Sequence, residues 1–260
     1  MTPKSFDLRG RVALITGAGS PSGIGLSAAS LLGELGARVA ISSTTGRITE
    51  RVEQLEERGL IASGHIADLT DERQVASLVR EVVDRHGHID IVVNNAGMVS
   101  VSAAGESGSL VDMSLATWRA GLARNLDTAF LMAREVLPAM RERRWGRIVN
   151  VASVTGPSMA MRDEPAYAAA KAGMVGLARS IAVDFGADGI TANAVAPGWI
   201  QTGSQTKHEH AQGLQAPVGR SATPDEVASA IAWLCTPGAA YVTGQCVVVD
   251  GGNSISEERT

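Results

Sequence analysis

Short, continuously apolar runs alternate with longer helical stretches along this chain. The runs at 11–16 and 38–42 carry aliphatic residues in succession, without the polar alternation of a strand that has one face in water. Strands of this kind are buried on both faces, so helices must cover both sides of their sheet. Right-handed crossovers then favour a doubly wound α/β fold, the Rossmann arrangement, with a mostly parallel sheet. Further strands are predicted at 60–67, 89–94, 147–152, 190–196 and 246–250, which makes seven.

Helical patterns occupy the intervals between the strands. One helix, from Pro224 to about Cys235, has a sharply defined start, because Thr223 offers an N-cap hydroxyl and Glu226 can complete a capping box. No linker, low-complexity tract or internal repeat is visible, so residues 1–260 are expected to form one domain. The other helices are predicted at 25–35, 48–58, 71–86, 115–143 (with a bend near Pro138) and 166–185.

Composition narrows the classes of function. Hydrophobic residues make up 45% of the chain and charged residues 19%, as in soluble proteins with a sizeable core. The net charge is −4 and no basic run occurs, which argues against nucleic acid or an anionic membrane as a partner. No apolar run approaches the roughly 20 residues of a membrane span, and residues 1–11 lack the apolar stretch of a signal peptide. A cytoplasmic enzyme is the resulting expectation.

Cysteine and histidine usage indicates no metal site. Cys235 and Cys246 do not form a Cys-x-x-Cys pair, so neither a disulfide scaffold nor a zinc site is indicated, and both are expected to be small buried hydrophobic residues. His208 and His210 have no clear third ligand, which favours a solvated loop over a metal.

Tyr167 and Lys171 form a Tyr-x-x-x-Lys pair within the predicted helix at 166–185. Residues four apart lie on one helix face, so the pair places a phenol beside an ammonium. A tyrosine pKa of about 10 is high for proton exchange at neutral pH, and a neighbouring positive charge is expected to lower it. The pair can thus serve as a general acid for reducing a carbonyl, or as a base for oxidising an alcohol. Alone, the motif can arise by chance in any helical chain.

A glycine-rich segment, 16–25, joins the first predicted strand to the first helix. Glycines there permit a tight turn and close approach of backbone to a pyrophosphate, and the helix N-terminus supplies amide donors. A plain strand–helix loop is the alternative, which its position in the first βαβ unit disfavours. The candidate contacts to a dinucleotide in this segment are Gly17, Ser20, Gly23, Ile24 and Gly25.

The end of the second strand bears on the choice between NAD and NADP. A carboxylate there would accept a hydrogen bond from the ribose 2′-hydroxyl of NAD, but residues 42–45 are all serine or threonine. Hydroxyls of Ser43 and Thr44, with the guanidinium of Arg47, can hold a 2′-phosphate. NADP(H) is therefore favoured, without excluding NAD(H). The alternative is that Arg47 lies on the solvated start of the next helix.

Together these motifs resemble those of the short-chain dehydrogenase/reductase family, over about residues 8–253. Asn94-Asn95-Ala96-Gly97 matches the motif after the fourth strand, and Asp68-Leu69 matches the acidic position that contacts the adenine. Asn125 matches the asparagine in the middle of a helix, and Ser153, Tyr167 and Lys171 match the catalytic trio. The segment beside the nicotinamide corresponds to Pro197, Gly198, Ile200 and Thr202, and with Asn95, Ala96 and Gly97 these are candidate cofactor contacts.

The resemblance implies a role for each catalytic residue. Tyr167 would donate a proton to the carbonyl oxygen, while Ser153 hydrogen-bonds that oxygen. Lys171 would lower the phenol's pKa and hold the nicotinamide ribose, and Asn125 would bind a water that links Lys171 to solvent. Taken singly, Ser153 can be a hydroxyl that caps a loop, and Asn125 can mark a helix kink.

The chain departs from the family pattern in three places. Five residues instead of three separate Gly17 from Gly23, and Pro21 among them has no N–H to offer a phosphate. The basic residue that many NADP-using relatives carry in this loop is absent. Ser153 and Tyr167 are 14 residues apart, slightly more than is common, and the stretch 98–113 is extended. These segments are expected to shape the mouth of the substrate site.

The chain, including 248–252 near its end, is similar to the 3-oxoacyl-thioester reductases of the family, a resemblance shared by relatives that act on sugars, cyclic alcohols and steroids. It implies reduction of a β-keto group, on an acyl thioester or a small molecule. A secondary-alcohol, polyol or steroid-type dehydrogenase is the alternative, and a dinucleotide-binding sensor without catalysis is a third possibility. The substrate segment is expected at about 202–217, as a polar mobile loop. Met159, Met161 and Trp199 can line the pocket, although the methionines can equally belong to the core. A homotetramer is expected, through the helices at 115–143 and 166–185, where Ala168, Ala169, Ala172 and Gly173 permit close approach.

Overall fold

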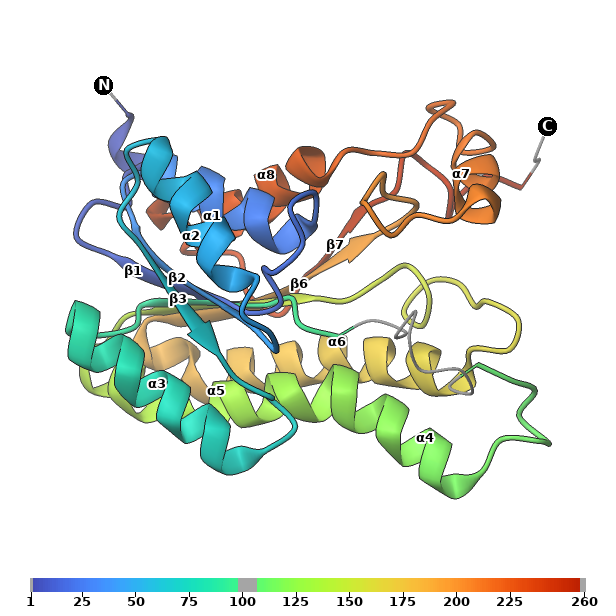
Figure 1. The fold of residues 1–260 in the computed structure, drawn as a ribbon, viewed down its shortest axis with the longest axis horizontal. Helices are drawn as coiled ribbons and strands as arrows, with labels where there is room; N and C mark the ends of the chain where they lie inside the picture. The colour runs from blue at the N-terminus through green and yellow to red at the C-terminus, as the bar shows by residue number, and fades with distance from the viewer. Residues whose placement is uncertain (1, 98–106, 258–260) are drawn as a thin grey trace.

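The computed structural model describes residues 2–97 and 107–257 (Figure 1). Its strands are β1 (Val12–Ile15), β2 (Arg38–Ser43), β3 (Ala62–Ile66), β4 (Ile91–Asn94), β5 (Gly146–Val151), β6 (Ile190–Pro197) and β7 (Cys246–Val249). The helices are α1 (Ile24–Glu34), α2 (Ile48–Glu57), α3 (Glu72–His86), α4 (Leu115–Leu122), α5 (Thr128–Glu142), α6 (Pro165–Phe185), α7 (Lys207–Gly213) and α8 (Pro224–Cys235). Short helical turns add η1 (Lys4–Phe6), η2 (Ala123–Asp127), η3 (Gly186–Asp188) and η4 (Pro237–Ala239).

The seven strands form one sheet in the order β3-β2-β1-β4-β5-β6-β7, and every neighbouring pair is parallel. The chain runs outward from β1 to β3 and then crosses back, so that β4 pairs with the other side of β1. At this switch point the chain after β1 and the chain after β4 lead to helices on opposite faces of the sheet, and ligands bind in the crevice at such a point. The predicted doubly wound α/β fold is confirmed.

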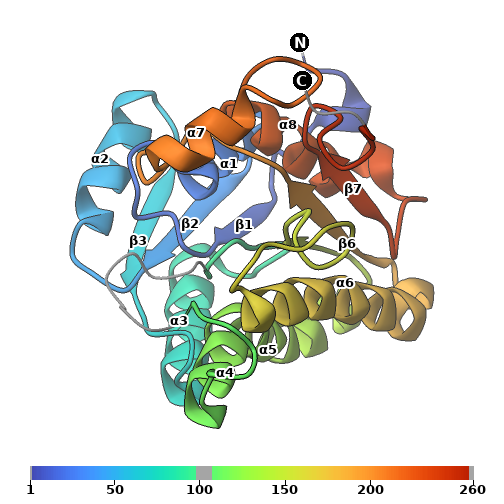
Figure 2. The same ribbon diagram turned by 90° about the vertical axis from the view of Figure 1, so that its right-hand side faces the viewer.

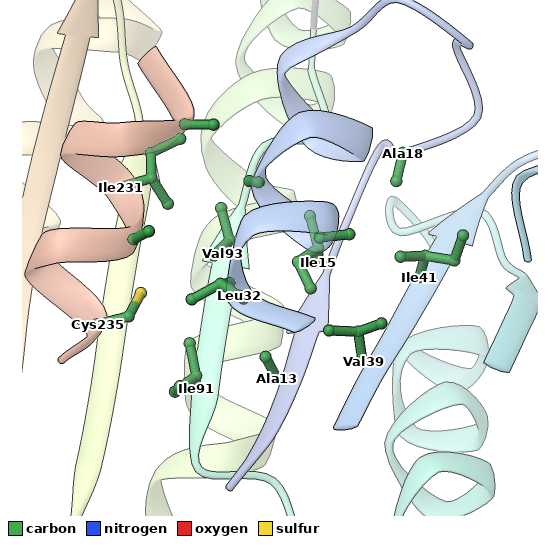
Figure 3. Close-up of a cluster of buried hydrophobic side chains, with 14 of the residues drawn as sticks. Ala13, Ile15, Ala18, Leu32, Val39, Ile41, Ile91, Val93, Ile231 and Cys235 are labelled. Atoms are coloured by element: carbon green, nitrogen blue, oxygen red, sulfur yellow. The ribbon is translucent and has the colours of Figure 1, made fainter. Parts of the chain in front are cut away.

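Helices cover both faces of the sheet, with α1, α2 and α8 on one side and α3, α4, α5 and α6 on the other (Figures 1 and 2). The side chains of successive β1 residues pack alternately into the hydrophobic cores on the two sides of the sheet. Ala13 and Ile15 belong to the core beneath α1 and α8, which Figure 3 shows, while Val12 and Leu14 belong to the core beneath α3, α5 and α6. All four residues are fully buried, which accounts for the unbroken apolar run.

The predicted strands and helices are present, with two differences. The stretch 115–142 is helical throughout, as predicted, but it contains a π-helical turn, η2, between α4 and α5, and Pro138 lies inside α5. Residues 202–217 are not wholly loop, because they contain α7, which begins with a capping box between Thr206 and Glu209. The spacing Thr-x-x-Glu was a readable signal for this helix.

Two sequence expectations concern the surroundings of the protein. Within residues 2–97 and 107–257, no helix has the length and apolar character needed to cross a membrane. Both cysteines are free: Cys235 is buried in α8, whereas Cys246 is only partly buried at the start of the edge strand β7.

The capping box predicted for α8 is present in full. The Thr223 hydroxyl accepts a hydrogen bond from the Glu226 backbone N–H at 3.3 Å, and the Glu226 carboxylate accepts one from the Thr223 N–H at 2.8 Å. Arg220 pairs with the same carboxylate and, as the largest cause, lowers the pKa of Glu226 to about 2. Since α8 packs against α1, this cap helps to hold the layer that carries the glycine-rich loop.

Replacing Thr223 by Val is therefore expected to lower the free energy of unfolding by about 1 kcal/mol, because the side-chain acceptor is lost at nearly unchanged volume. Thr223→Ser retains the hydroxyl and is the matched control, expected to stay close to the wild type. Urea unfolding followed by circular dichroism measures both, and equal losses in the two variants would contradict the assignment of the cap.

Candidate active site

A cavity of about 600 Å³ opens where the strands end. It lies between the loops that follow β1, β4, β5 and β6 and is bounded outside the sheet by the start of α6 and by α7. In Figure 1, α7 and the loops leading into α6 lie at the same end of the molecule. Fourteen of the predicted site residues line the cavity: Gly17, Ser20, Gly23, Ile24, Asn95, Ala96, Gly97, Ser153, Tyr167, Lys171, Pro197, Gly198, Ile200 and Thr202.

The loops after β1 and β4 are in direct contact on one wall of the cavity. The Thr16 hydroxyl accepts hydrogen bonds from the backbone amides of Asn95 (3.1 Å) and Ala96 (2.9 Å). The Asn95 side-chain amide donates in return to the carbonyls of Thr16 and Gly17. Gly17 has a φ of +68°, and a Cβ there would lie 2.7 Å from the Ala96 Cα, so this approach requires glycine.

The N-terminus of α1 faces this wall with free donors. Its N-cap, Gly23, makes no side-chain cap, so the amides of the first turn have no capping acceptor. Gly25, in that turn, packs so closely that a Cβ would lie 2.6 Å from the Asn95 side chain. Free amides at a helix N-terminus, approached by bare backbone, form a binding site for a phosphate group.

The residues expected to select the cofactor lie at the ends of β2 and β3, outside the cavity wall. The Arg47 side chain turns back over the glycine loop, because a Cβ on Gly19 would lie 2.8 Å from its Nε and 2.9 Å from the Ser43 Cβ. The Ser43 hydroxyl binds the Thr45 backbone, and Thr44 is exposed. Arg47 is therefore beside the loop, not merely on the solvated start of α2. Of the adenine pair, Asp68 is exposed after β3 and Leu69 is buried.

Ser153 and Tyr167 meet in the cavity from two elements. Ser153 lies two residues past β5, where its hydroxyl accepts from the Thr155 amide at 3.1 Å, and Tyr167 lies in the first turn of α6. Burial raises the pKa of Tyr167, and its hydrogen bond with Ser153 lowers the pKa by less. The predicted lowering of this pKa by Lys171 is therefore wrong for the folded chain, because desolvation of the phenol outweighs the other influences. At neutral pH the hydroxyl keeps its proton.

Lys171 is almost fully buried, one helical turn beyond Tyr167. Its Nζ donates to the Val151 carbonyl at 2.9 Å and lies 5.5 Å from the centre of the Tyr167 ring. Burial lowers the pKa of Lys171 to about 8, so the amine is mainly charged at neutral pH. The Asn150 side chain donates to the Met174 carbonyl at 2.9 Å, which ties this part of α6 to β5.

Asn125 stands behind the cavity in the π-helical turn η2. Its Nδ2 donates to the Gly121 carbonyl at 3.1 Å, whereas its buried Oδ1 has no hydrogen-bond partner among the residues described. A Cβ on Gly97 would lie 2.8 Å from this oxygen, so Asn125 points toward the loop after β4. A buried acceptor without a partner is rare and indicates a bound water or ligand. π-Helical turns are themselves frequent at functional sites.

Two acidic residues form the far side of the cavity. Glu164 precedes α6 and was not among the predicted site residues, whereas Glu209 is in α7, within the predicted substrate segment; both line the cavity beside Tyr167. Nothing in the chain around Glu164 signalled its place, which depends on how the loop before α6 folds. Met161 and Trp199 line the cavity as expected. Met159 does not line it, and its sulfur instead contacts the Asn253 amide at 3.5 Å.

Two further predictions concern the stretch 98–113 and the two histidines of the substrate segment. Most of the stretch 98–113 lies outside the described residues, so its part in the substrate mouth stays a prediction. His208 and His210 are exposed on α7, and within the described ranges no group of three His, Cys, Asp or Glu residues is placed to hold a metal.

Comparison with known proteins shows what the whole chain is similar to. The sequence model of a family described as enoyl-(acyl carrier protein) reductase matches residues 17–254. The chain is 38% identical to the 3-oxoacyl-[acyl-carrier-protein] reductase FabG of Pseudomonas aeruginosa, over 96% of this chain and 100% of that protein. It is 36% identical to the (2S)-[(R)-hydroxy(phenyl)methyl]succinyl-CoA dehydrogenase subunit BbsD of Thauera aromatica, over 95% of this chain and 98% of that protein. The crystal structure of a proposed gluconate dehydrogenase from Agrobacterium tumefaciens superposes with a TM-score of 0.89, at 30% identity, covering 98% and 100% of the two chains.

The chain belongs to the short-chain dehydrogenase/reductase family. It is an oxidoreductase that acts on CH–OH or C=O groups with a nicotinamide dinucleotide. The residues present fit such a cofactor. The first turn of α1 offers uncapped amides, Gly17 leaves a cradle that a Cβ would fill, and the buried Asn125 oxygen has no hydrogen-bond partner within residues 2–97 and 107–257.

The burial of Lys171 makes a prediction about stability. Because the folded pKa, about 8, lies below the unfolded value of 10.5, the buried charge destabilises the fold fully below pH 8, and this penalty disappears as pH rises past 10.5. Lys171→Met is expected to raise the free energy of unfolding at pH 7 by on the order of 1–3 kcal/mol, the lost bond to Val151 offsetting part of the gain.

The gain in Lys171→Met should shrink when unfolding is measured at pH 10. Lys4→Met, at an exposed lysine, controls for loss of one charge and should show neither effect. A Lys171 variant less stable than the wild type at pH 7 would contradict a penalty from burial.

Proposed function

We propose that this enzyme is an NADP-dependent reductase of ketones, with a 3-oxoacyl thioester as its first substrate class. The observation that carries the proposal is the convergence of a protonated phenol, a serine hydroxyl and a buried ammonium in one cavity at the ends of parallel strands. Such a set polarises a carbonyl and supplies its proton, which is what carbonyl reduction requires from the protein.

The cofactor would occupy the part of the cavity beside the glycine loop. The amides at the start of α1 and the backbone around Gly17 would hold the pyrophosphate, and Ser20, Ile24, Gly25 and Asp68–Leu69 belong to the same proposed contacts. Lys171 would bind the nicotinamide ribose. Asn95, Ala96, Gly97, Pro197, Gly198, Ile200 and Thr202 would surround the nicotinamide. When bound, a reduced nicotinamide supplies the hydride that reaches the carbonyl carbon.

Proton movement is the task of the chain's own residues. The Tyr167 hydroxyl donates its proton to the carbonyl oxygen, and the Ser153 hydroxyl hydrogen-bonds the same oxygen as negative charge develops there. Lys171 stabilises the phenolate that remains, from 5.5 Å across the ring. Asn125 Oδ1 holds a water through which the proton at Lys171 is replaced. The raised pKa of Tyr167 keeps the phenol protonated at neutral pH, which favours reduction over oxidation.

The preference for NADP is supported by the end of β2. Ser43 and Thr44 replace the carboxylate that would bind an unmodified ribose, and Arg47 lies against Gly19 with no acidic partner among the described residues. A guanidinium in this place offers charged hydrogen bonds to a 2′-phosphate. Pro21 and the two extra loop residues redirect the other phosphate contacts toward the amides that remain.

Two further classes compete for the substrate. The structural neighbour that is a proposed gluconate dehydrogenase favours a polyol or secondary alcohol as substrate. The two relatives whose names contain an acyl-carrier-protein or CoA thioester favour a 3-oxoacyl thioester. A sensor without catalysis would need neither Tyr167 nor Lys171. The buried charge of Lys171 lowers the stability of the fold, and a catalytic role would account for its presence.

We also propose one domain over residues 1–260, with a substrate segment at 202–217, in a cytoplasmic homotetramer. Exposed apolar side chains on the helices concerned, Leu115 on α4 and Phe130 on α5, support pairing there. The small residues of α6 serve contacts within the chain as well, since a Cβ on Gly156 would lie 2.3 Å from the Ala168 carbonyl. Analytical ultracentrifugation tests the tetramer.

Tyr167→Phe is expected to reduce the turnover of a short 3-oxoacyl thioester by NADPH by about 10²–10⁴-fold, because the proton donor is removed while the ring remains. The chain contains one other tyrosine, Tyr241, which is fully exposed, so Tyr241→Phe is the control and should keep wild-type activity. NADPH absorbance at 340 nm follows both variants. Full activity in Tyr167→Phe would remove the proposed acid.

Arg47→Gln is expected to weaken NADPH binding about tenfold with little change for NADH, because it removes a charged hydrogen bond to the 2′-phosphate. Arg80→Gln, at an exposed arginine of α3, controls for the lost charge. Fluorescence titration with both cofactors measures the two dissociation constants. Equal weakening for NADH and NADPH would assign Arg47 a role apart from the phosphate.

A further inference from the structure

Glu164 is an acidic side chain in the wall of the cavity, and it is unusually well shielded for a carboxylate. The residue is 9% exposed, and it lines the cavity three positions before Tyr167 at the start of α6. Residues three apart at a helix end face the same way, so the carboxylate and the phenol look into one space. Burial of a carboxylate is expensive unless charge or hydrogen bonds compensate it.

Compensation for this charge within the described residues is slight. The Ser107 hydroxyl donates to Glu164 Oε1, and no lysine, arginine or histidine of the described ranges forms an ion pair with the carboxylate. Lys171, the one cation among the described residues that line the cavity, donates to the Val151 carbonyl and forms no ion pair with Glu164. Among the described residues, the Ser107 hydroxyl is thus the one hydrogen-bond donor to the Glu164 side chain, which lines the cavity.

Glu209 adds a second negative charge from the opposite element. It lines the same cavity from α7. Its Oε2 also accepts a hydrogen bond from the Thr206 backbone N–H at 2.7 Å. Both carboxylates are close enough to Tyr167 to raise its pKa, after burial as the largest cause. Their fields thus overlap at the reacting group, even though they come from segments some 45 residues apart in the chain.

The geometry points to Glu164, assisted by Glu209, as the residue that selects the substrate by charge: it accepts a hydrogen bond from a cationic or N–H/O–H-bearing group next to the ketone and excludes a ketone that carries a neighbouring carboxylate. This inference rests on the proposed function, because it assumes that the ketone sits at Tyr167. A donor on the substrate would complete the hydrogen bonding of Glu164, whereas an anion would be repelled by two carboxylates in a site of reduced dielectric.

The test uses three amides of 3-oxobutanoic acid that share the ketone and differ in charge. They are the N-(2-aminoethyl) amide, a cation; the N-propyl amide, neutral; and the N-(carboxymethyl) amide, an anion. The wild-type chain is expected to bind and reduce them in the order cation, neutral, anion, with about tenfold or more between the ends. In Glu164→Gln, which preserves shape and the contact to Ser107, this ratio should fall at least fivefold.

Glu57→Gln is the matched control, because it removes the same charge at an exposed site on α2 and should leave the ratio unchanged. A second readout is the alkaline limb of the pH–rate profile with the neutral amide. Loss of the Glu164 charge should move this limb to lower pH, because the carboxylate holds the pKa of Tyr167 up. A role in packing alone would move neither the ratio nor the limb.

Calorimetric dissociation constants for the three amides separate this inference from the proposed reaction. Binding in the expected order, lost in Glu164→Gln but without turnover of any amide, would overturn the proposed reductase and retain the charge selection. Turnover without charge order in the wild type, an equal ratio in the Glu164 and Glu57 variants, or no binding of any of the three would overturn the inference itself.

Discussion

The site depends on the contact between the ends of β1 and β4. The Thr16 hydroxyl accepts hydrogen bonds from the two backbone amides that follow β4. The Asn95 side chain donates two hydrogen bonds to carbonyls at the start of the glycine loop. The two backbones can meet because Gly17 has no Cβ to collide with Ala96. This contact forms one wall of the cavity at the switch point of the sheet. The N-terminus of α1, which offers the phosphate donors, follows the glycine loop directly in the chain.

A second feature of the site is that it holds ionisable groups where burial disfavours their charge. Lys171 remains mainly charged at neutral pH, with the Val151 carbonyl and the Met174 sulfur as hydrogen-bond acceptors, and Tyr167 remains neutral. The hydrophobic cores on both sides of the sheet contribute stability that offsets the unfavourable burial of these groups. The pKa of Tyr167 is raised, although a lysine lies four positions away in the same helix, because desolvation of the phenol has the larger effect. The shift of a pKa therefore cannot be predicted from sequence neighbours alone.

Local patterns predicted most elements because each has a local cause. Unbroken apolar runs became strands buried on both faces, and Thr223 with Glu226 formed the expected cap. The π-helical turn at 123–127 was missed since it arises where Asn125 turns toward the loop at Gly97, a contact between distant segments. The helix α7 was missed although Thr206 and Glu209 carry a capping box, because a seven-residue helix leaves little periodicity.

The sequence by itself determined the parallel sheet, the glycine-rich turn and the order of Ser153, Tyr167 and Lys171, because apolar period, backbone freedom and spacing along one helix are local properties. Tertiary structure decided what surrounds these groups. It placed Arg47 against Gly19, left the buried Asn125 oxygen without a hydrogen-bond partner in the described part of the chain, and brought Glu164 and Glu209 to the cavity from separate segments. Burial and electrostatic fields depend on every element packed around a site, so these features exist only once the whole chain has folded.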